Sequence, residues 1–314
     1  MTLNFHPDRL LADGRMVVEA LLEVGRYKNQ FETGLSNGSR TAFAGGARDG
    51  WEETLFGGAY HEPVAEASER PKYGALDVMH HADGGSPRFG SCYVVLRAHV
   101  NARCTFTWGD SHLGPADVGV ADAFDSILAA MLESADVTGG VLAARLTVPE
   151  LVERVSRAAA VGPVGRALDD YIEAQVHGTI ELSRDVEALV VDPAFEGTEV
   201  GARLRELCER HAIEHRVHPG FELLVSEVPG DFRGPRMPAF AARAASVSSG
   251  PTSHPVMLDA SIIGRAAQSL HRDPSVWEDW DTPEETLQHV KQLWHVLVRY
   301  GAPPPPPPQA EASG

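Results

Sequence analysis

Cysteine is scarce in this sequence. The chain has 314 residues but only three cysteines, Cys92, Cys104 and Cys208. Their number is odd and none of them has C-x-x-C spacing, which argues against both a disulfide framework and a zinc cage. A reducing compartment fits this usage best, so we expect a cytoplasmic protein.

Positive charge is also in short supply. The chain has 27 Lys and Arg residues against 44 Asp and Glu, a formal net charge of -17. Such a surface repels polyanions, so nucleic acid is not expected as a partner. No window approaches 18 uninterrupted apolar residues, and Met1 is not followed by a basic segment and an apolar run. The sequence therefore predicts neither a membrane span nor a visible export signal.

Several catalytic motifs are missing as well. The chain has no G-x-S-x-G elbow, no G-x-x-x-x-G-K-[ST] loop and no G-x-G-x-x-G after a strand. His211, His215 and His218 have a spacing that can hold a metal, but the segment crosses from a helix into an expected hairpin and has no Glu beside the first His. We therefore expect no metal. A metal hydrolase, or a hydrolase built on Cys92 and His177, stays open as a third possibility.

One stretch of the chain alternates strictly between polar and apolar residues. Residues 171–178 read Tyr-Ile-Glu-Ala-Gln-Val-His-Gly, and side chains alternate across a strand. The pattern places four polar side chains on one face, namely Tyr171, Glu173, Gln175 and His177. Two interpretations are open at this point. The strand is either a half-exposed edge strand with solvated polar residues or a catalytic strand aimed at a site.

The remaining elements follow from periodicity and turn residues. With 43% hydrophobic residues the chain can bury a large core. Helices are expected at residues 7–23, 121–134, 149–160, 199–211, 257–271 and 283–300. Strands are expected at the start of 25–38 and at 88–97, 103–107, 171–178 and 186–191, with a hairpin at 213–218 and 221–225. Residues 43–60, rich in glycine and aromatics, predict a long loop or lid.

Four segments carry side chains that together suit a nucleotide with a pyrophosphate. Arg26 offers a forked donor for phosphate, Tyr73 a ring for stacking and Ser91 a strand hydroxyl. A carboxylate at Glu173 can face the positive charge of an oxocarbenium-like sugar. The candidate catalytic residues are Glu173, Gln175, Tyr171 and His177, and the candidate ligand-binding residues are Arg26, Gln30, Tyr73 and Ser91.

Five stretches carry a resemblance that covers nearly the whole chain. They are QFETGLSNG at residues 30–38, ERPKYGAL at 69–76, PRFGSC at 87–92, YIEAQVHG at 171–178 and KQLWH at 291–295. These stretches resemble a bacterial family known as domain of unknown function 3626. The resemblance brings no established activity with it.

A looser resemblance concerns the order of three strands. The series Arg26, Ser91, Glu173 is similar to the R-S-E arrangement of arginine-type mono-ADP-ribosyltransferases. That resemblance implies that the Arg contacts NAD, the Ser orders the site and the Glu stabilises the ribose cation. The superfamily usually has Glu or Gln two residues before the catalytic Glu, where this chain has Tyr171, with Gln175 two residues after. It also prefers Ser-Thr-Ser where this chain reads Gly-Ser-Cys at residues 90–92, and the departures leave the acceptor of ADP-ribose open.

These observations combine into one expectation for the whole chain. We expect an α+β protein with two small, mostly antiparallel sheets that form an ADP-ribosyltransferase-like cleft over residues 1–235, a helical extension at 236–301 and a proline-rich tail at 302–314. The resemblance implies NAD-dependent mono-ADP-ribosyl transfer or NAD glycohydrolysis, with NAD as substrate and a protein or small molecule as acceptor. The alternative is a non-catalytic binding protein that uses the cleft and the tail for a partner.

Overall fold

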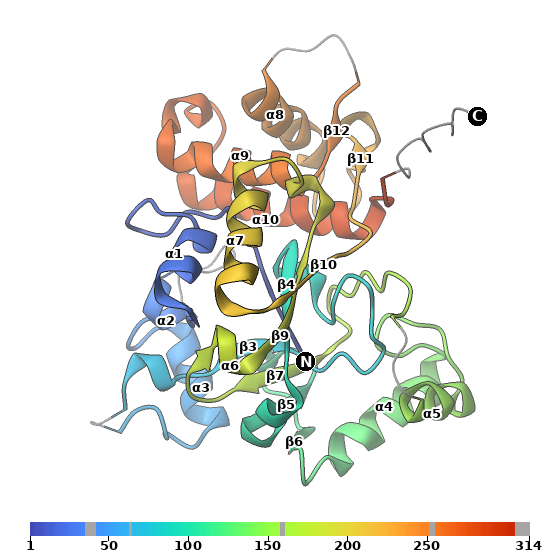
Figure 1. Cartoon of the computed structure of the whole chain (residues 1–314). Helices are drawn as coiled ribbons and strands as arrows, with labels where there is room; N and C mark the ends of the chain where they lie inside the picture. Colours follow the sequence, from blue (N-terminus) through green and yellow to red (C-terminus); the bar gives the residue numbers. More distant parts are fainter. Residues whose placement is uncertain (35–41, 63–64, 158–160, 251–254, 305–314) are drawn as a thin grey trace, which may run out of the picture.

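The computed structural model describes residues 1–34, 42–62, 65–157, 161–250 and 255–304. Within them, helices surround one large mixed sheet, and two small sheets lie beside it (Figure 1). The expected α+β class is therefore confirmed. Most of the proline-rich tail, residues 305–314, lies outside the described part of the chain.

The large sheet has eight strands in the order β10-β9-β4-β1-β3-β7-β5-β6. All neighbours are antiparallel except β9 and β10, which are parallel. The strands are β1 (Thr2–Phe5), β3 (Lys72–Ala75), β4 (Cys92–Leu96), β5 (Cys104–Trp108), β6 (Val118–Val120), β7 (Ile172–Val176), β9 (Val186–Val191) and β10 (Glu214–Val217). Two small sheets pair β2 (Arg26–Tyr27) with β8 (Ile180–Glu181) and β11 (Leu223–Leu224) with β12 (Met257–Leu258).

The expectation that two small sheets form the fold is wrong, because strand β1 joins them into one eight-stranded sheet. This strand lies between β4 and β3. Without it, β10-β9-β4 and β3-β7-β5-β6 would be separate sheets of three and four strands. All four residues of β1 are buried. The strand has only four residues, and although they alternate between polar and apolar, so short an alternation does not identify a strand.

Two glycines allow the backbone of β1 to pack this closely. A methyl group at Gly90 would lie 2.2 Å from the carbonyl carbon of Phe5, and one at Gly74 would lie 2.3 Å from the carbonyl oxygen of Thr2. Both contacts are with backbone atoms, which cannot rotate away as a flexible side chain can. The glycines therefore fix the place where the two halves of the sheet meet.

Strand β7 is an interior strand, paired with β3 on one side and β5 on the other. The edge-strand interpretation of residues 171–178 is therefore wrong, while the strand itself is confirmed. Ile172, Ala174 and Val176 are fully buried and belong to the apolar core. Glu173 and Gln175 are buried on the opposite face, as the alternation predicted.

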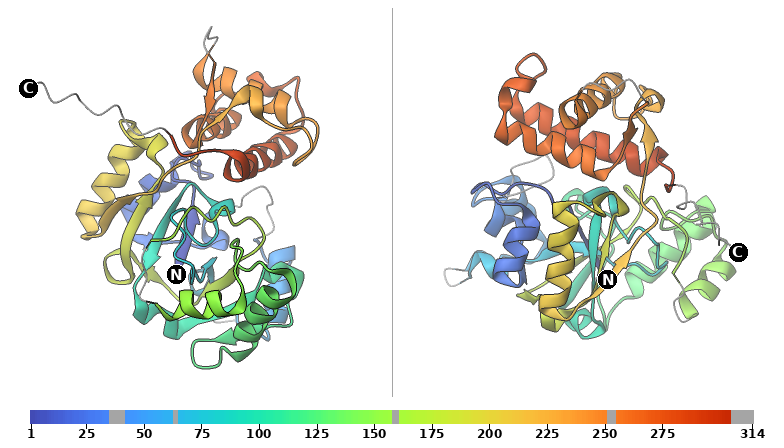
Figure 2. Two further views of the ribbon diagram at one scale, coloured as in Figure 1. Left: turned by 90° about the vertical axis from the view of Figure 1, so that its right-hand side faces the viewer. Right: turned by 45° about the horizontal axis from the view of Figure 1, so that its top comes forward.

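Helices cover the sheet and gather at its ends. Figures 1 and 2 show α8, α9 and α10 together at one end of the molecule, while α4 and α5 lie in another corner. No helix in the described ranges has the length and apolar character needed to cross a membrane. The helices are α1 (Val17–Val24), α2 (Gln30–Thr33), α3 (Ala47–Leu55), α4 (Asp125–Thr138), α5 (Val148–Ser156), α6 (Leu182–Asp185), α7 (Glu199–His211), α8 (Met237–Ser249), α9 (Ala260–Arg272) and α10 (Pro283–Tyr300).

Three local expectations were wrong. Residues 7–23 are helical only from Val17, because Leu10 and Met16 form a β-bridge that closes the preceding turn. Residues 43–60 contain helix α3, whose apolar periodicity is interrupted by Gly50. Residues 213–225 do not form a hairpin, since β10 pairs in parallel with β9 and β11 pairs with β12. The Pro219-Gly220 turn redirects the chain to another sheet instead of folding it back.

The contact at Gly90 can be tested by adding one methyl group. We expect Gly90→Ala to lower the free energy of unfolding by about 2 kcal/mol or more, because the new atom overlaps the β1 backbone. Gly50→Ala is the matched control. Nothing lies within 4 Å of a methyl group there, and alanine in an exposed helix should stabilise by up to about 1 kcal/mol. Urea denaturation measures both, and equal stabilities for the two variants would contradict the tight contact.

Candidate functional site

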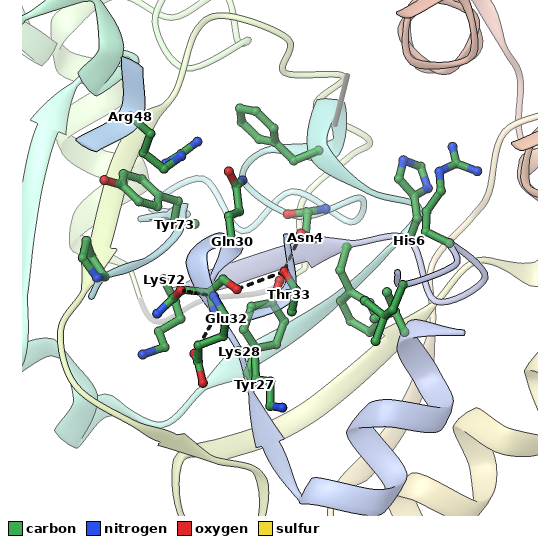
Figure 3. Close-up of a pocket in the computed structure, with 18 of the residues that line it drawn as sticks. Asn4, His6, Tyr27, Lys28, Gln30, Glu32, Thr33, Arg48, Lys72 and Tyr73 are labelled. Carbon is green, nitrogen blue, oxygen red and sulfur yellow. Dashed lines mark hydrogen bonds between the residues drawn. The ribbon is translucent and has the colours of Figure 1, made fainter. Parts of the chain in front are cut away.

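A pocket of about 660 Å³ opens beside the large sheet. It is lined by β1, by α1 and the loop before it, by β2, α2, α3 and β3, and by Glu173 on β7, as Figure 3 shows for part of the wall. Lys291 of α10 also lines it. Trp294 anchors that helix, because its indole Nε1 donates to the carbonyl of Pro87 at 2.7 Å. The C-terminal helices thus complete a pocket that begins at the N-terminal strand.

The charge of the pocket is opposite to that of the chain. Among the described lining residues, eight are Lys or Arg and four are Asp or Glu, whereas the chain has 27 and 44 of these. The eight cations are Arg9, Arg15, Arg26, Lys28, Arg48, Lys72, Arg88 and Lys291. A local excess of cations in an acidic protein favours an anionic ligand.

The structure brings together half of the residues selected from sequence. Arg26, Gln30, Tyr73 and Glu173 all line the pocket. Their origins differ, since Arg26 lies in β2, Gln30 opens α2, Tyr73 lies in β3 and Glu173 in β7. The other four candidates, Tyr171, Gln175, His177 and Ser91, are not among the lining residues.

Glu173 is the buried acid of the pocket, with only 4% of its surface exposed. Its Oε1 accepts hydrogen bonds from Gln175 Nε2 at 2.8 Å and from the Ser111 amide at 3.3 Å. Burial, with a further contribution from the charge of Asp110, raises the pKa of Glu173 to about 7, although the two hydrogen bonds favour the ionised form. Near neutral pH the carboxyl group is therefore present in both charge states.

Gln175 links Glu173 to a chain of hydrogen bonds behind the pocket. Thr105 Oγ1 donates to Gln175 Oε1 at 2.8 Å and lies 3.0 Å from His177 Nε2. His177 Nδ1 in turn contacts the hydroxyl of Tyr60. Gln175 and His177 therefore support Glu173 from behind.

The direction of this chain follows from Glu173 Oε1, which also accepts from the Ser111 amide. Gln175 therefore presents its NH₂ group to that oxygen and its carbonyl to Thr105. The Thr105 hydroxyl donates its only proton to that carbonyl, so it must accept a hydrogen bond from His177 Nε2–H. This leaves His177 Nδ1 as the acceptor for Tyr60. Burial, together with Arg103 and Lys72, lowers the pKa of His177 to about 4, so the ring is neutral.

Tyr171 is buried beside Glu173 but is held more loosely. Its hydroxyl lies 3.5 Å from Glu173 Oε2, at the long limit of a hydrogen bond. Its ring meets Phe89 edge-on at 5.8 Å. Burial, and next the charge of Glu173, raise the pKa of Tyr171 well above its usual value. Tyr171 thus serves as a neutral neighbour of the acid.

Ser91 takes part in a different environment. Its carbonyl accepts a hydrogen bond from His218 Nε2 at 2.8 Å, and its buried hydroxyl has no partner among the described residues. His218 Nδ1 accepts from the Gly220 amide at 3.0 Å, so both ring nitrogens are used. Across the described residues, no group of three or more His, Cys, Asp or Glu could hold a metal ion.

The Cys92 and His177 pair is wrong as a catalytic pair. Cys92 lies in β4 and His177 directly follows β7, and β1 and β3 separate these two strands. Three strand spacings amount to roughly 14 Å. Cys92 is fully buried, and burial raises the pKa of its thiol well above the ordinary value. It is a core residue.

The sequence model of one protein family matches residues 1–300, with the description "Protein of unknown function (DUF3626)". The chain belongs to this family. The match spans both ends of the pocket, from Asn4 in β1 to Lys291 in α10. No curated protein matches the chain.

In this DUF3626 protein, helix α3 adds site residues that the sequence did not predict. Arg48 and Trp51 line the pocket. Glu52 anchors the helix, since its Oε1 accepts from the Tyr73 hydroxyl at 2.8 Å and its Oε2 from Arg70 Nη1 at 2.9 Å. The four-residue spacing of the opposite charges Arg48 and Glu52 is a helical signal in this segment, and the surrounding glycines obscured it.

The direction of the hydrogen-bond chain can be tested by nitrogen NMR of the histidines. We expect His177 to be the Nε2–H tautomer and to stay neutral from pH 8 down to about pH 4, because its pKa is lowered. The signals that disappear in His177→Gln identify the residue. An Nδ1–H tautomer, or a titration near pH 6.5, would contradict the assignment.

Proposed function

We propose that this DUF3626 protein cleaves the nicotinamide–ribose bond of NAD, as an NAD glycohydrolase or a mono-ADP-ribosyltransferase. The observation that carries the proposal is a buried carboxylate, Glu173, in the wall of a pocket with eight basic and four acidic lining residues in the described chain. NAD combines two features that this wall suits. It has an anionic pyrophosphate and a glycosidic bond whose cleavage generates positive charge.

The proposed reaction needs no metal and no redox partner. The bond between ribose C1′ and the nicotinamide nitrogen breaks, and its electron pair leaves with nicotinamide. An oxygen of water or of another acceptor bonds to C1′ and releases a proton. The Glu173 carboxylate faces the ribose when the ribose carries positive charge, so it stabilises the transition state more than the ground state. Such electrostatic stabilisation contributes several kcal/mol in comparable sites.

The other lining residues have complementary roles in this proposal. Arg26 has no ion pair among the described residues and offers a forked donor to an anion. Tyr73 presents an aromatic ring, and Gln30 presents an amide whose carbonyl oxygen has no partner among the described residues. The finer likeness to an ADP-ribosyltransferase cleft is part of this proposal and rests on the order Arg26, Ser91, Glu173 in the chain.

Water is the acceptor that we favour. In the resembling transferases, a Glu or Gln two residues before the catalytic acid activates the acceptor. The corresponding Tyr171 is buried and does not line the pocket. No equivalent group at that position reaches the pocket to deprotonate an acceptor side chain. Hydrolysis makes less demand on such a group than modification of a protein does.

The role of Glu173 can be tested with a near-isosteric change. We expect Glu173→Gln to keep the fold, because its amide oxygen can accept from Gln175, and to abolish release of nicotinamide. It should still bind NAD in calorimetry, since the carboxylate acts in the transition state. Wild-type protein that binds NAD without releasing nicotinamide would favour the binding-protein alternative. Unchanged turnover in Glu173→Gln would remove Glu173 from the reaction.

The contribution of Arg26 is a separate test. Arg26→Lys keeps the charge and loses the forked geometry, so we expect NAD binding to weaken by about 1 to 3 kcal/mol. Calorimetric titration compares it with wild type and with Glu173→Gln. Wild type that gives no heat with millimolar NAD would contradict the proposed function.

The pKa of Glu173 also sets a pH dependence. A raised pKa of about 7 means that the working carboxylate forms as the pH rises through neutrality. We expect kcat/KM for NAD to increase between pH 6 and pH 8 and then to level off. The measurement is nicotinamide release at limiting NAD. A rate that falls over this range would show that the protonated acid is the active form.

A further inference from the structure

Helix α3 presents three N–H groups that lack an acceptor. Arg48 Nε, Arg48 Nη1 and Trp51 Nε1 are buried and have no hydrogen-bond partner among the described residues. Both side chains line the pocket. A buried donor without an acceptor costs roughly 1 to 3 kcal/mol, so such a cluster is rare in a folded protein without a purpose. Because all three atoms are donors, the group that satisfies them is an acceptor.

Two aromatic rings hold the guanidinium of Arg48. Its central carbon lies 4.7 Å from the centroid of the Trp51 ring and 4.5 Å from that of Tyr73. Figure 3 shows Arg48 beside Tyr73, with the Gln30 side chain pointing toward the same part of the pocket. Stacking uses the faces of the guanidinium and leaves the N–H groups at its edges. Within the described residues, the cation is therefore held in place by the two rings and not by hydrogen bonds.

The acidic groups around Arg48 already have other partners. Glu52 accepts from Tyr73 and Arg70. Asp49 accepts from the Gly45 amide at 2.8 Å and pairs with Arg70 at 2.5 Å. No ion pair joins Arg48 to either of them in the described residues, although Glu52 lies four residues along the same helix. The charge of Arg48 is thus left for the pocket.

We propose that Arg48 is the main phosphate receptor of the pocket, with Trp51 donating a further hydrogen bond from its indole. The ligand class is a phosphate-bearing molecule, and its identity as NAD rests on the proposed function. Phosphate oxygens match the donors because they accept several N–H bonds at once and carry the opposite charge. Arg48 and Glu173 line the same pocket, and the charge of Arg48 acts to lower the pKa of Glu173 while burial, the larger influence, raises it.

Three other arginines of the pocket show why Arg48 is the one selected. Arg88 also has a buried Nε without a partner among the described residues, but its Nη1 already pairs with Asp169. Arg15 is already paired with Asp13 and Glu23 through its guanidinium nitrogens. Arg26 is half-buried and is not among the residues with buried, unpartnered nitrogens. Leaving Arg26 without a ligand therefore costs little free energy. Without a ligand, Arg48 has N–H donors that are buried from water and bonded to no described residue, which is unfavourable.

The test uses probes that have no nicotinamide bond. Full-length wild type, Arg48→Lys and Arg203→Lys are titrated calorimetrically with inorganic pyrophosphate and with ADP-ribose. We expect Arg48→Lys to weaken both by about 10- to 100-fold, because the ammonium keeps the charge but loses the stacked, multiple donors. Arg203→Lys is the matched control, because Arg203 lies in α7 with surface ion pairs and does not line the pocket, so the affinity should change less than about twofold. Trp51→Phe keeps a stacking ring and loses one donor, so we expect an intermediate loss.

The outcomes separate this inference from the proposed function. Thermal melting of each variant establishes that it is folded. If Arg48→Lys does not fold, Trp51→Phe provides the result instead. Phosphate binding that depends on Arg48, in a protein that releases no nicotinamide, supports the receptor and removes the glycohydrolase. Nicotinamide release with no loss of ADP-ribose affinity in Arg48→Lys supports the enzyme and overturns the receptor. Wild type that binds neither probe at millimolar concentration also overturns it.

Discussion

The backbone of β1 packs directly against two glycines, and this contact joins the two halves of the large sheet. Gly90 and Gly74 leave no room for a side chain where they meet Phe5 and Thr2. On one side of this seam lie β4, β9 and β10, and on the other β3, β7, β5 and β6. The pocket depends on the seam, since Asn4 and Phe5 of β1 line it together with Tyr73 of β3 and Glu173 of β7. A shift of β1 would displace the acid relative to the cations that face it.

The site combines a buried acid with a positively charged wall. Keeping Glu173 away from water disfavours its charge, and the donors from Gln175 and Ser111 offset part of that cost. The chain through Thr105 and His177 then holds the Gln175 amide in the one orientation that an ionised acid accepts. In the wall of the same pocket, the stacked guanidinium of Arg48 has Nε and Nη1 donors without a partner among the described residues. The Glu173 carboxylate is positioned by Gln175 and the Arg48 guanidinium by two aromatic rings, so neither charge is paired with an opposite charge by these neighbours.

Sequence reasoning succeeded where a long, regular pattern coincided with burial. The alternation at residues 171–178 located β7 and assigned Glu173 and Gln175 to one face, and the periodicity of residues 199–211 and 283–300 gave α7 and α10. It failed at β1, where the alternation of polar and apolar residues covers only four positions, and at α3, where Gly50 and flanking glycines resemble a loop. Ser91 was also predicted for the site, but it does not line the pocket. Sequence order indicates that Ser91 adjoins strand β4, but it does not show that β1 lies between β4 and the strands that carry Tyr73 and Glu173. The residues missed at α3, Arg48 and Trp51, come from the segment whose local signal was weakest.

The pocket draws its wall from both ends of the chain. Asn4 lies in β1 and Lys291 lies in α10. The hydrogen bond from Trp294 to the Pro87 carbonyl holds α10 in place. Contacts of such sequence separation are late events, because the intervening chain must first be closed into a loop. During synthesis the sheet can assemble around β1 while α10 is still missing. The pocket can therefore hold a ligand only after residues 283–300 have been made and have packed in place.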